Sequence, residues 1–253
     1  MAIEAWLVPV MALALIVLER LPRTRRLALP LLRRGWLTDL VLLALGLAIL
    51  APLGIAWVRW ASTTLGHAGW PGVPIAAFAL QLVVALVLID LGNYTAHWAM
   101  HRFPVLWRFH QVHHSSRRLD WLATFRAHLV DQLVRRLVAP LFAIAIGLPV
   151  APMLAAGTIL LAWAMLGHSN LAHRPSRIET VLITPRLHRV HHVAASSASN
   201  LGTLFVWWDR LLGRLELRTP LDSEALGVPG AIDRYPQSLF GLLRAPFQAT
   251  NGR

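Results

Sequence analysis

The hydrophobic positions along this chain gather into long apolar runs separated by short polar segments. Runs at residues 3–18, 37–58 and 75–92 carry few or no charges, and each approaches or reaches the length that crosses roughly 30 Å of hydrocarbon. They predict three membrane-spanning helices. Glycine and proline at residues 61–73 predict a loop between the second and third helices, and we expect no role for His67 in that loop.

Two shorter apolar runs follow, at residues 137–150 and 153–166, and prolines lie at their junction. Each is short for a full crossing, so together they predict a helical hairpin that enters and leaves the membrane on one side. A polar, histidine-rich stretch at residues 93–131 precedes the hairpin. The expected fold class is all-α: an integral membrane helical bundle with three full spans plus a helical hairpin, and a cytoplasmic histidine-rich helical cap.

Composition supports the membrane assignment. The chain has 253 residues, of which 56% are hydrophobic and only 14% charged, and its mean hydropathy is +0.55. The absence of cysteine excludes disulfides, thiolate metal sites and a cysteine nucleophile. The net charge is +12, and the arginines that carry it flank apolar runs, which favours anionic lipids over nucleic acid as the partner surface.

The arginines also predict an orientation. The segment at residues 20–34 is strongly basic, so the positive-inside rule places it in the cytoplasm. Counting spans from there, residue 97 and the segment after residue 167 emerge on that same side. We therefore expect a protein of the bacterial inner membrane with its active site on the cytoplasmic face.

The candidate chemistry lies in the histidines, because eight of the 12 fall into three clusters with helical spacing. Residues three or four apart are neighbours on a helix, so each cluster can present several imidazoles together. Imidazole suits zinc, copper, iron or nickel, and eight ligands exceed the four of one zinc site, which predicts a two-metal centre. The clusters are His97 and His101; His110, His113 and His114; and His188, His191 and His192.

Several segments resemble the fatty acid hydroxylase / sterol desaturase superfamily over about residues 85–215. They are 90–115, His168-Ser-Asn170, 184–192, Asn200-Leu-Gly202 and 208–213. The resemblance implies an integral membrane di-iron oxygenase that hydroxylates or desaturates a lipid within the bilayer. It would use O₂ and electrons from a separate donor of the ferredoxin, flavodoxin or cytochrome type. The implied cofactors are two Fe ions, with zinc as a substitute in purified protein.

Carried over by position, the resemblance implies nine metal ligands and no catalytic residues beyond them. The ligands are His97, His101, His110, His113, His114, His168, His188, His191 and His192. Candidates for an additional ligand, or for orienting a ligand ring through its second nitrogen, are His128, His173, Asp90, Asn170, Asn200 and Asp209. Helix capping and turn formation explain the last four equally well. The chain departs from the family pattern at Leu201 and Arg214, which bears on the substrate subclass. It also has Leu129 where the family element has proline after His128, so we expect His128 to support a ligand or the structure more than to bind metal itself.

Three regions follow from these patterns: an N-terminal transmembrane region at 1–84, a catalytic domain at 85–215 and a C-terminal cytoplasmic tail at 216–253.

Two other functions remain open. A non-catalytic metal-binding or transport protein is disfavoured because its histidines belong at mid-bilayer, whereas these lie just beyond span ends. A membrane zinc hydrolase is disfavoured because no carboxylate lies inside the clusters. The residues do not separate hydroxylation from desaturation.

Overall fold

The computed structural model describes residues 2–30, 32–65, 77–195 and 198–248, with side chains described from residue 6 at the N-terminal end. Most of the predicted loop at 61–73, including His67, lies outside these ranges. Within them the chain is helical, and extended pairing is limited to isolated bridges such as Arg25 with Leu171. The predicted all-α class is confirmed.

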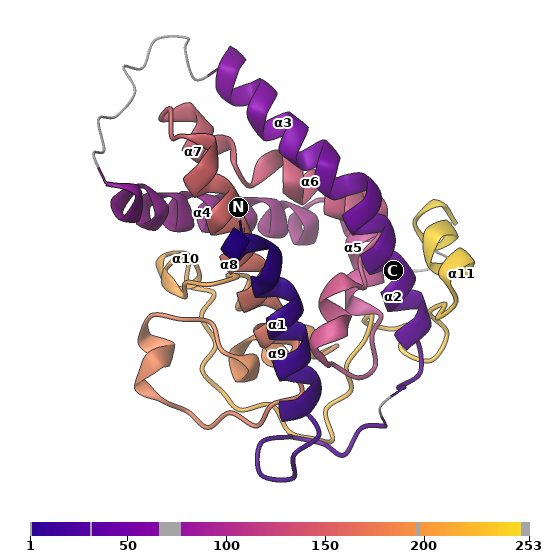
Figure 1. Ribbon diagram of the computed structural model, residues 1–253. Helices are drawn as coiled ribbons and strands as arrows, with labels where there is room; N and C mark the ends of the chain where they lie inside the picture. The colour runs from indigo at the N-terminus through magenta and orange to yellow at the C-terminus, as the bar shows by residue number, and fades with distance from the viewer. Residues whose placement is uncertain (1, 31, 66–76, 196–197, 249–253) are drawn as a thin grey trace.

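The helices follow one another in the order shown in Figure 1. They are α1 (Ala2–Leu18), α2 (Trp36–Leu45), the π-helical turn η1 (Gly46–Leu50), α3 (Ala51–Thr64), α4 (Phe78–Arg102), α5 (Pro104–His114), η2 (Trp121–Phe125), α6 (Leu129–Val138), α7 (Leu141–Ala145), α8 (Val150–His168), η3 (Arg177–Thr180), α9 (Pro185–His192), α10 (Trp207–Leu211), α11 (Leu239–Arg244) and η4 (Ala245–Phe247).

Three helices among the described residues are long and apolar enough to cross a membrane, which is the number predicted. The first is the continuous helix Trp36–Thr64, formed by α2, η1 and α3, which runs along one side of the molecule in Figure 1. The others are α4 and α8. The third candidate is thus the second limb of the expected hairpin. The first apolar run forms α1, whose described apolar part, Trp6–Leu18, is shorter.

The first limb of the expected hairpin is not one helix. Its residues are divided between the end of α6, the short helix α7 and a turn at Gly147, whose φ of 72° is left-handed. Pro140 and Pro149 lie at the two boundaries of α7 and its turn. Proline has no N–H to donate and restricts the residue before it, so a continuous helix cannot form here.

Helix α4 continues past the end of the predicted span at residue 92 and ends at Arg102. The stop is local: Pro104 restricts Phe103, which has extended backbone angles (φ −101°, ψ 121°), and Pro104 then occupies the first turn of α5. Two helices that both carry histidines are thereby joined by a single bend.

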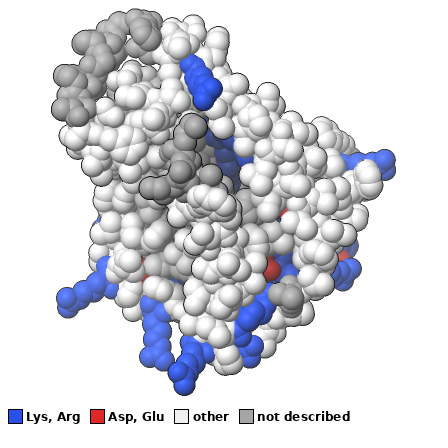
Figure 2. Space-filling model, viewed as in Figure 1, with Lys and Arg blue, Asp and Glu red and all other residues white. Residues whose placement is uncertain are grey.

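The packing exposes apolar side chains on the outside. Helix α4 packs against α8, α5, α6 and α7, and α1 packs against α8. Large apolar side chains such as Trp6, Leu13, Leu53 and Leu80 are more than half exposed. In Figure 2 the arginines gather mainly at the lower end of the molecule, and the upper part is almost free of charge. Apolar surface on this scale is that of a membrane protein.

Among the described glycines, Gly92 is the one at which an added Cβ would come closest to another atom. A Cβ atom built on Gly92 would lie 2.1 Å from the carbonyl oxygen of Ala139, which is a backbone atom that cannot rotate away. We expect Gly92→Ala to separate α4 from the end of α6 and to lower the free energy of unfolding by about 1–3 kcal/mol or more. Chemical unfolding in detergent measures this. Gly157→Ala is the matched control, because its Cβ would meet no atom within 4 Å. Equal stability of the two variants would contradict the expectation.

Candidate metal centre

Four helices bring the predicted histidines to one place. Helix α4 contributes His97 and His101 from its last two turns, and α8 contributes His168 at its last residue. Helices α5 and α9 carry the other two clusters. Both α5 and α9 have proline at the start, and in α9 the side chain of Thr184 accepts a hydrogen bond from the N–H of Leu187 as an N-cap.

The nine histidines divide into two groups, and within each group the nearest ring nitrogens all lie within 4.8 Å of one another. The group of five draws on α4, α5 and α9, and the group of four on α5, α8 and α9. The group of five is His97, His101, His110, His114 and His191, and the group of four is His113, His168, His188 and His192.

Helical spacing explains the division. Two histidines that are four residues apart always belong to the same group. Helices α5 and α9 each carry one further histidine, and it belongs to the group that the pair on that helix does not join. Thus His110 and His114 join the first group and His113 the second, and α9 repeats the pattern in reverse. Residues three and four apart flank the same helix face from opposite sides, so one helix can serve two neighbouring sites.

In the group of five, every Nε2 atom is buried without a hydrogen-bond partner. In three of these rings the other nitrogen is already engaged: Nδ1 of His97 with the carbonyl of Leu201 at 2.8 Å, that of His191 with the carbonyl of Ser199 at 2.9 Å, and that of His110 with Asp131 at 2.7 Å. A carbonyl only accepts, so Nδ1 of His97 and of His191 must carry the proton, and Nε2 is then a bare lone pair.

Two rings of the group of four have the same property. Nδ1 of His168 donates to the carbonyl of Ala164 at 2.8 Å, and Nδ1 of His113 donates to the carbonyl of Arg126 at 3.2 Å. Their two Nε2 atoms are nevertheless only 3.0 Å apart. Two bare lone pairs at this distance repel each other unless a cation lies between them. The donor set of both groups therefore fits metal ions.

The rings are held in the neutral form that binds metal. Burial lowers the pKa of the six cluster histidines of α5 and α9, and the pKa of His191 falls to about 3. Neighbouring rings and Arg135 oppose a proton on them as well. Neutral imidazole is the ligand form, so this environment favours metal over protons.

Asp131 is the one carboxylate that contacts a cluster ring in the described part of the chain, and the sequence interpretation missed it. It lies in the first turn of α6, is 1% exposed, and also accepts a hydrogen bond from Nε of Arg135 at 2.9 Å. Burial raises the pKa of Asp131, and the Arg135 guanidinium opposes that shift. An acid in a buried helix position, four residues before an arginine, is the signal that could have identified it.

We expect Asp131→Asn to lower the metal affinity of the group of five by about 10–100-fold, as loss of a carboxylate behind a ligand imidazole typically does. Competition with a chelator of known affinity measures the change. Asp222→Asn is the control, because Asp222 pairs with Arg26 at the surface and is 60% exposed. Unchanged affinity in Asp131→Asn would mean that the 2.7 Å contact with His110 does not orient the ring.

Three of the predicted orienting residues, Asp90, Asn200 and Asp209, bond mainly to backbone groups and not to the ligand rings. Asp209 accepts hydrogen bonds from the N–H groups of Leu201 and Gly202, and so fixes the loop whose Leu201 carbonyl accepts from His97. Asn200 has a left-handed φ of 53° and bonds the backbone of Leu187 and Glu216. Asp90 on α4 accepts from the N–H groups of residues 204 and 205 and from the indole of Trp208.

The remaining candidates lie away from both groups. Asn170 bonds the backbone N–H and carbonyl of Leu27, joining the end of α8 to the arginine-rich segment. His128 is the N-cap of α6, where its Nδ1 accepts from the N–H of Val130. His173 contacts Ser176 at 3.3 Å and lies 3.7 Å from Glu179. Their observed partners are those of capping and loop residues.

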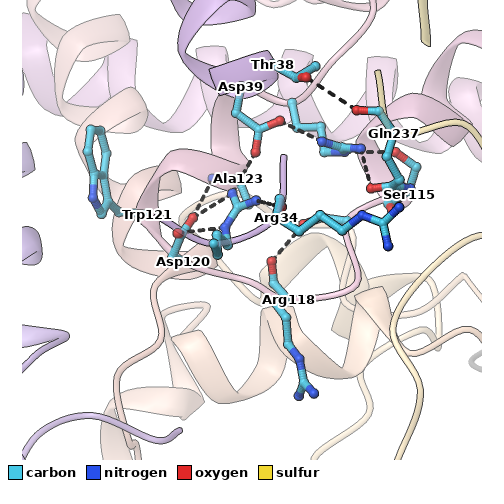
Figure 3. A network of polar contacts seen from close by, with 12 residues as sticks. Arg34, Thr38, Asp39, Ser115, Arg118, Asp120, Trp121, Ala123 and Gln237 are labelled. Atoms are coloured by element: carbon cyan, nitrogen blue, oxygen red, sulfur yellow. Dashed lines mark hydrogen bonds and ion pairs between the residues drawn. The ribbon is translucent and has the colours of Figure 1, made fainter. Parts of the chain in front are cut away.

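A buried ion network lies beside the clusters (Figure 3). Asp39, at the start of the first span, pairs with Arg126 at 2.8 Å and with Arg33 at 2.6 Å, and Arg33 also pairs with Asp120 at 2.7 Å. Arg126 also donates to Ser115 and Gln237, and its carbonyl accepts from His113. The arginine-rich segment therefore has a structural role besides the orientation expected from its charge.

A cavity of about 660 Å³ leads to the histidines. Its walls come from the first span, α4, α6 and α8 and are mostly apolar, with side chains such as Leu47, Val58 and Leu161. The histidines among its lining residues are His97, His113, His168 and His188, which represent both groups. A mostly apolar cavity between membrane helices that is also lined by histidines of both groups suits a lipid.

The chain has relatives among characterised proteins. The family model for fatty acid hydroxylase matches residues 82–214. The chain is 33% identical over 183 residues to ornithine lipid hydroxylase OlsE of Rhizobium tropici, covering 72% of this chain and 55% of the relative. It is 29% identical over 134 residues to the alkylglycerol monooxygenase of Danio rerio, covering 51% of this chain and 29% of that protein. The human alkylglycerol monooxygenase is 25% identical over 136 residues, which cover 52% of this chain and 30% of the relative.

The matched residues contain all nine clustered histidines, and the chain belongs to the fatty acid hydroxylase family. It spans 55% of the length of the ornithine lipid hydroxylase and less of the alkylglycerol monooxygenases. No solved structure matches it.

Proposed function

We propose that this protein is a membrane di-iron oxygenase that inserts oxygen into a C–H bond of a lipid. The observation that carries the proposal is the pair of buried histidine groups, both of which contribute side chains to the wall of a mostly apolar cavity. The names of the relatives, a lipid hydroxylase and a monooxygenase, favour hydroxylation over desaturation. The nine histidines would be the metal ligands, and all lie within the proposed catalytic domain at 85–215.

Two bound iron ions would supply the reduction of O₂ and the oxidant that removes hydrogen from the lipid. The protein's own residues do the rest. Asp131 and the backbone carbonyls of residues 126, 164, 199 and 201 hold ligand rings, and the cavity walls exclude water and place one C–H bond. Hydroxylation consumes O₂, two electrons and two protons, and it yields one alcohol and one water. A desaturation would consume the same reactants and yield a double bond and two waters.

The test uses full-length protein purified without oxygen and without added zinc. We expect about two irons per chain by mass spectrometry of the metals, and ¹⁸O from ¹⁸O₂ in one hydroxylated lipid of the host membrane. A lipid product that forms equally without O₂ would identify a hydrolase and overturn the proposal. Metal flux in proteoliposomes with no lipid product would identify a transporter and also overturn it.

We propose further that an acidic electron donor docks where arginines line a surface hollow of about 280 Å³, with Arg26, Arg117, Arg118 and Arg189 among its residues. Arg189 supports this placement because it lies on α9 between His188 and His191, and it is itself buried. On this proposal the hollow faces the cytoplasm of a bacterial inner membrane, and the arginines outside it meet anionic lipids.

Arg118→Glu tests the docking proposal. We expect it to lower turnover supported by an acidic ferredoxin, flavodoxin or cytochrome, and to leave turnover with dithionite unchanged, because only the protein donor must dock. Higher salt should reduce the first rate and not the second. Equal loss with both reductants would contradict the docking role.

A further inference from the structure

Two arginines enter the cavity that leads to the histidines. Arg135 and Arg136, both on α6, line it together with the apolar residues of the first span and of α8. They lie about one helical turn from Asp131, which holds His110. In Figure 2 basic surface is visible inside a hollow beside the long helix formed by α2 and α3. A cavity whose walls are mostly apolar therefore also carries two positive charges.

The two arginines differ in their partners. Arg135 pairs with Asp131 at 2.9 Å. Arg136 donates only to the backbone carbonyl and side-chain oxygen of Gln132, and among the described residues no carboxylate lies within ion-pair distance of it. Arg136 is partly buried, and its guanidinium has five N–H donors to satisfy. It therefore has capacity for an acceptor that the described chain does not supply.

Glycines in the helix Trp36–Thr64 leave room for the side chains of Arg136 and Gln132. A Cβ on Gly54 would lie 3.2 Å from Cδ of Arg136, and a Cβ on Gly46 would lie 2.6 Å from Oε1 of Gln132. The π-helical turn Gly46–Leu50 lies between these glycines. π-Helical turns within α-helices are often found at functional sites. Two glycines and a π turn in one span thus face the Gln132–Arg136 pair.

Arg136 lies beside the middle of a membrane-spanning helix, where a positive charge needs a reason. Gly46 and Gly54 lie on either side of the midpoint of the helix Trp36–Thr64, which is 29 residues long. A cation at this level of a membrane span is costly unless it pairs or lines a polar pathway, and such residues mark substrate sites. A neutral lipid would leave the guanidinium of Arg136 without an ionic partner.

We propose that Arg136, with Arg135 beside it, binds an anionic oxygen group of the lipid substrate, a carboxylate or a phosphate. Guanidinium pairs with both groups through two parallel hydrogen bonds, and Gln132 orients it. This assignment rests on the proposed function, because it takes the cavity to be the substrate site. It adds a substrate class: lipids whose anionic group enters the cavity near the histidines.

The test compares matched single-chain lipids on the full-length iron-loaded protein at pH 8.5. Radiolabelled oleic acid carries a carboxylate, oleoyl lysophosphatidic acid carries a phosphate, and oleyl alcohol is neutral. We expect one or both anionic lipids to bind the wild-type protein more tightly than the alcohol. In Arg136→Gln that lipid should bind at least about tenfold more weakly, whereas the affinity for oleyl alcohol stays the same. Arg136→Lys, which keeps the charge, should restore part of the preference.

Arg59→Gln is the matched control, because Arg59 lies on the same span, is exposed and is not part of the cavity wall. Metal content measured on each variant shows that the centre is intact. No preference for either anionic lipid in the wild type, or equal weakening of all three lipids in Arg136→Gln, would overturn the proposal. Failure of the oxygenase function is seen separately, as an absence of ¹⁸O product while the Arg136-dependent binding persists.

Discussion

His114→Ala and His192→Ala are each expected to remove about one of two irons and to lower lipid turnover by at least about a hundredfold. The two residues belong to different groups, so each variant should empty a different site. Both side chains are almost fully buried, and alanine has no nitrogen to offer the metal in their place. Loss of a residue that only orients a ligand costs about 10–100-fold, so loss of a ligand should cost at least as much.

Metal analysis of the anaerobically purified variants, together with product formation, measures both effects. His173→Ala is the matched control, because His173 lies outside both groups and its contacts are to Ser176 and Glu179. It should retain two irons and full turnover. If His114→Ala kept both irons, the assignment of the group of five as a metal site would be wrong.

Asp39→Ala is expected to destabilise the protein by about 3–5 kcal/mol, the cost of breaking a buried ion pair from one side. The substitution leaves two buried guanidinium groups, those of Arg33 and Arg126, without a shared carboxylate. Arg33 retains Asp120, whereas Arg126 retains only the neutral partners Ser115 and Gln237. Most of the loss should therefore arise at Arg126.

Reversible unfolding in mixed micelles measures the change in the free energy of unfolding. Asp222→Ala is the control, since its pair with Arg26 is exposed and exposed pairs contribute about 0–1 kcal/mol. Because the carbonyl of Arg126 accepts from His113, we also expect weaker metal binding by the group of four in Asp39→Ala. Similar stability of the two variants would show that the network in Figure 3 contributes little to folding.

Part of the metal centre could be predicted from residue patterns alone. Spacing identified the histidine clusters, because the helical repeat depends only on sequence separation. It did not assign His113 to a different group from its neighbour His114, because that depends on which helices lie on either side of α5. Helical spacing also could not identify the groups that hold the imidazole rings in place. Four of the contacts are to backbone carbonyls, which every residue type carries alike.

The fold, too, could be predicted only in part from the sequence. Apolar run length predicted helices and the number of candidate spans, since a helix that crosses hydrocarbon must satisfy its own backbone and be apolar over about 20 residues. It predicted a span for the first run, of which the described apolar part is Trp6–Leu18, and it did not anticipate that α8 alone is long enough to cross or that the chain breaks at α7. Proline and glycine positions indicate where a helix can end, but they did not show that α8 runs unbroken from Val150 to His168.

By itself the sequence determined an all-helical membrane protein with a set of imidazoles suited to two metal ions, because composition, run length and helical spacing are local properties. Only the tertiary structure decided how the nine histidines divide, that Asp131 holds His110, and that Arg135 and Arg136 enter the cavity. These are relations between helices distant in the chain. They depend on which faces pack together, and on close approaches such as those at Gly46, Gly54 and Gly92.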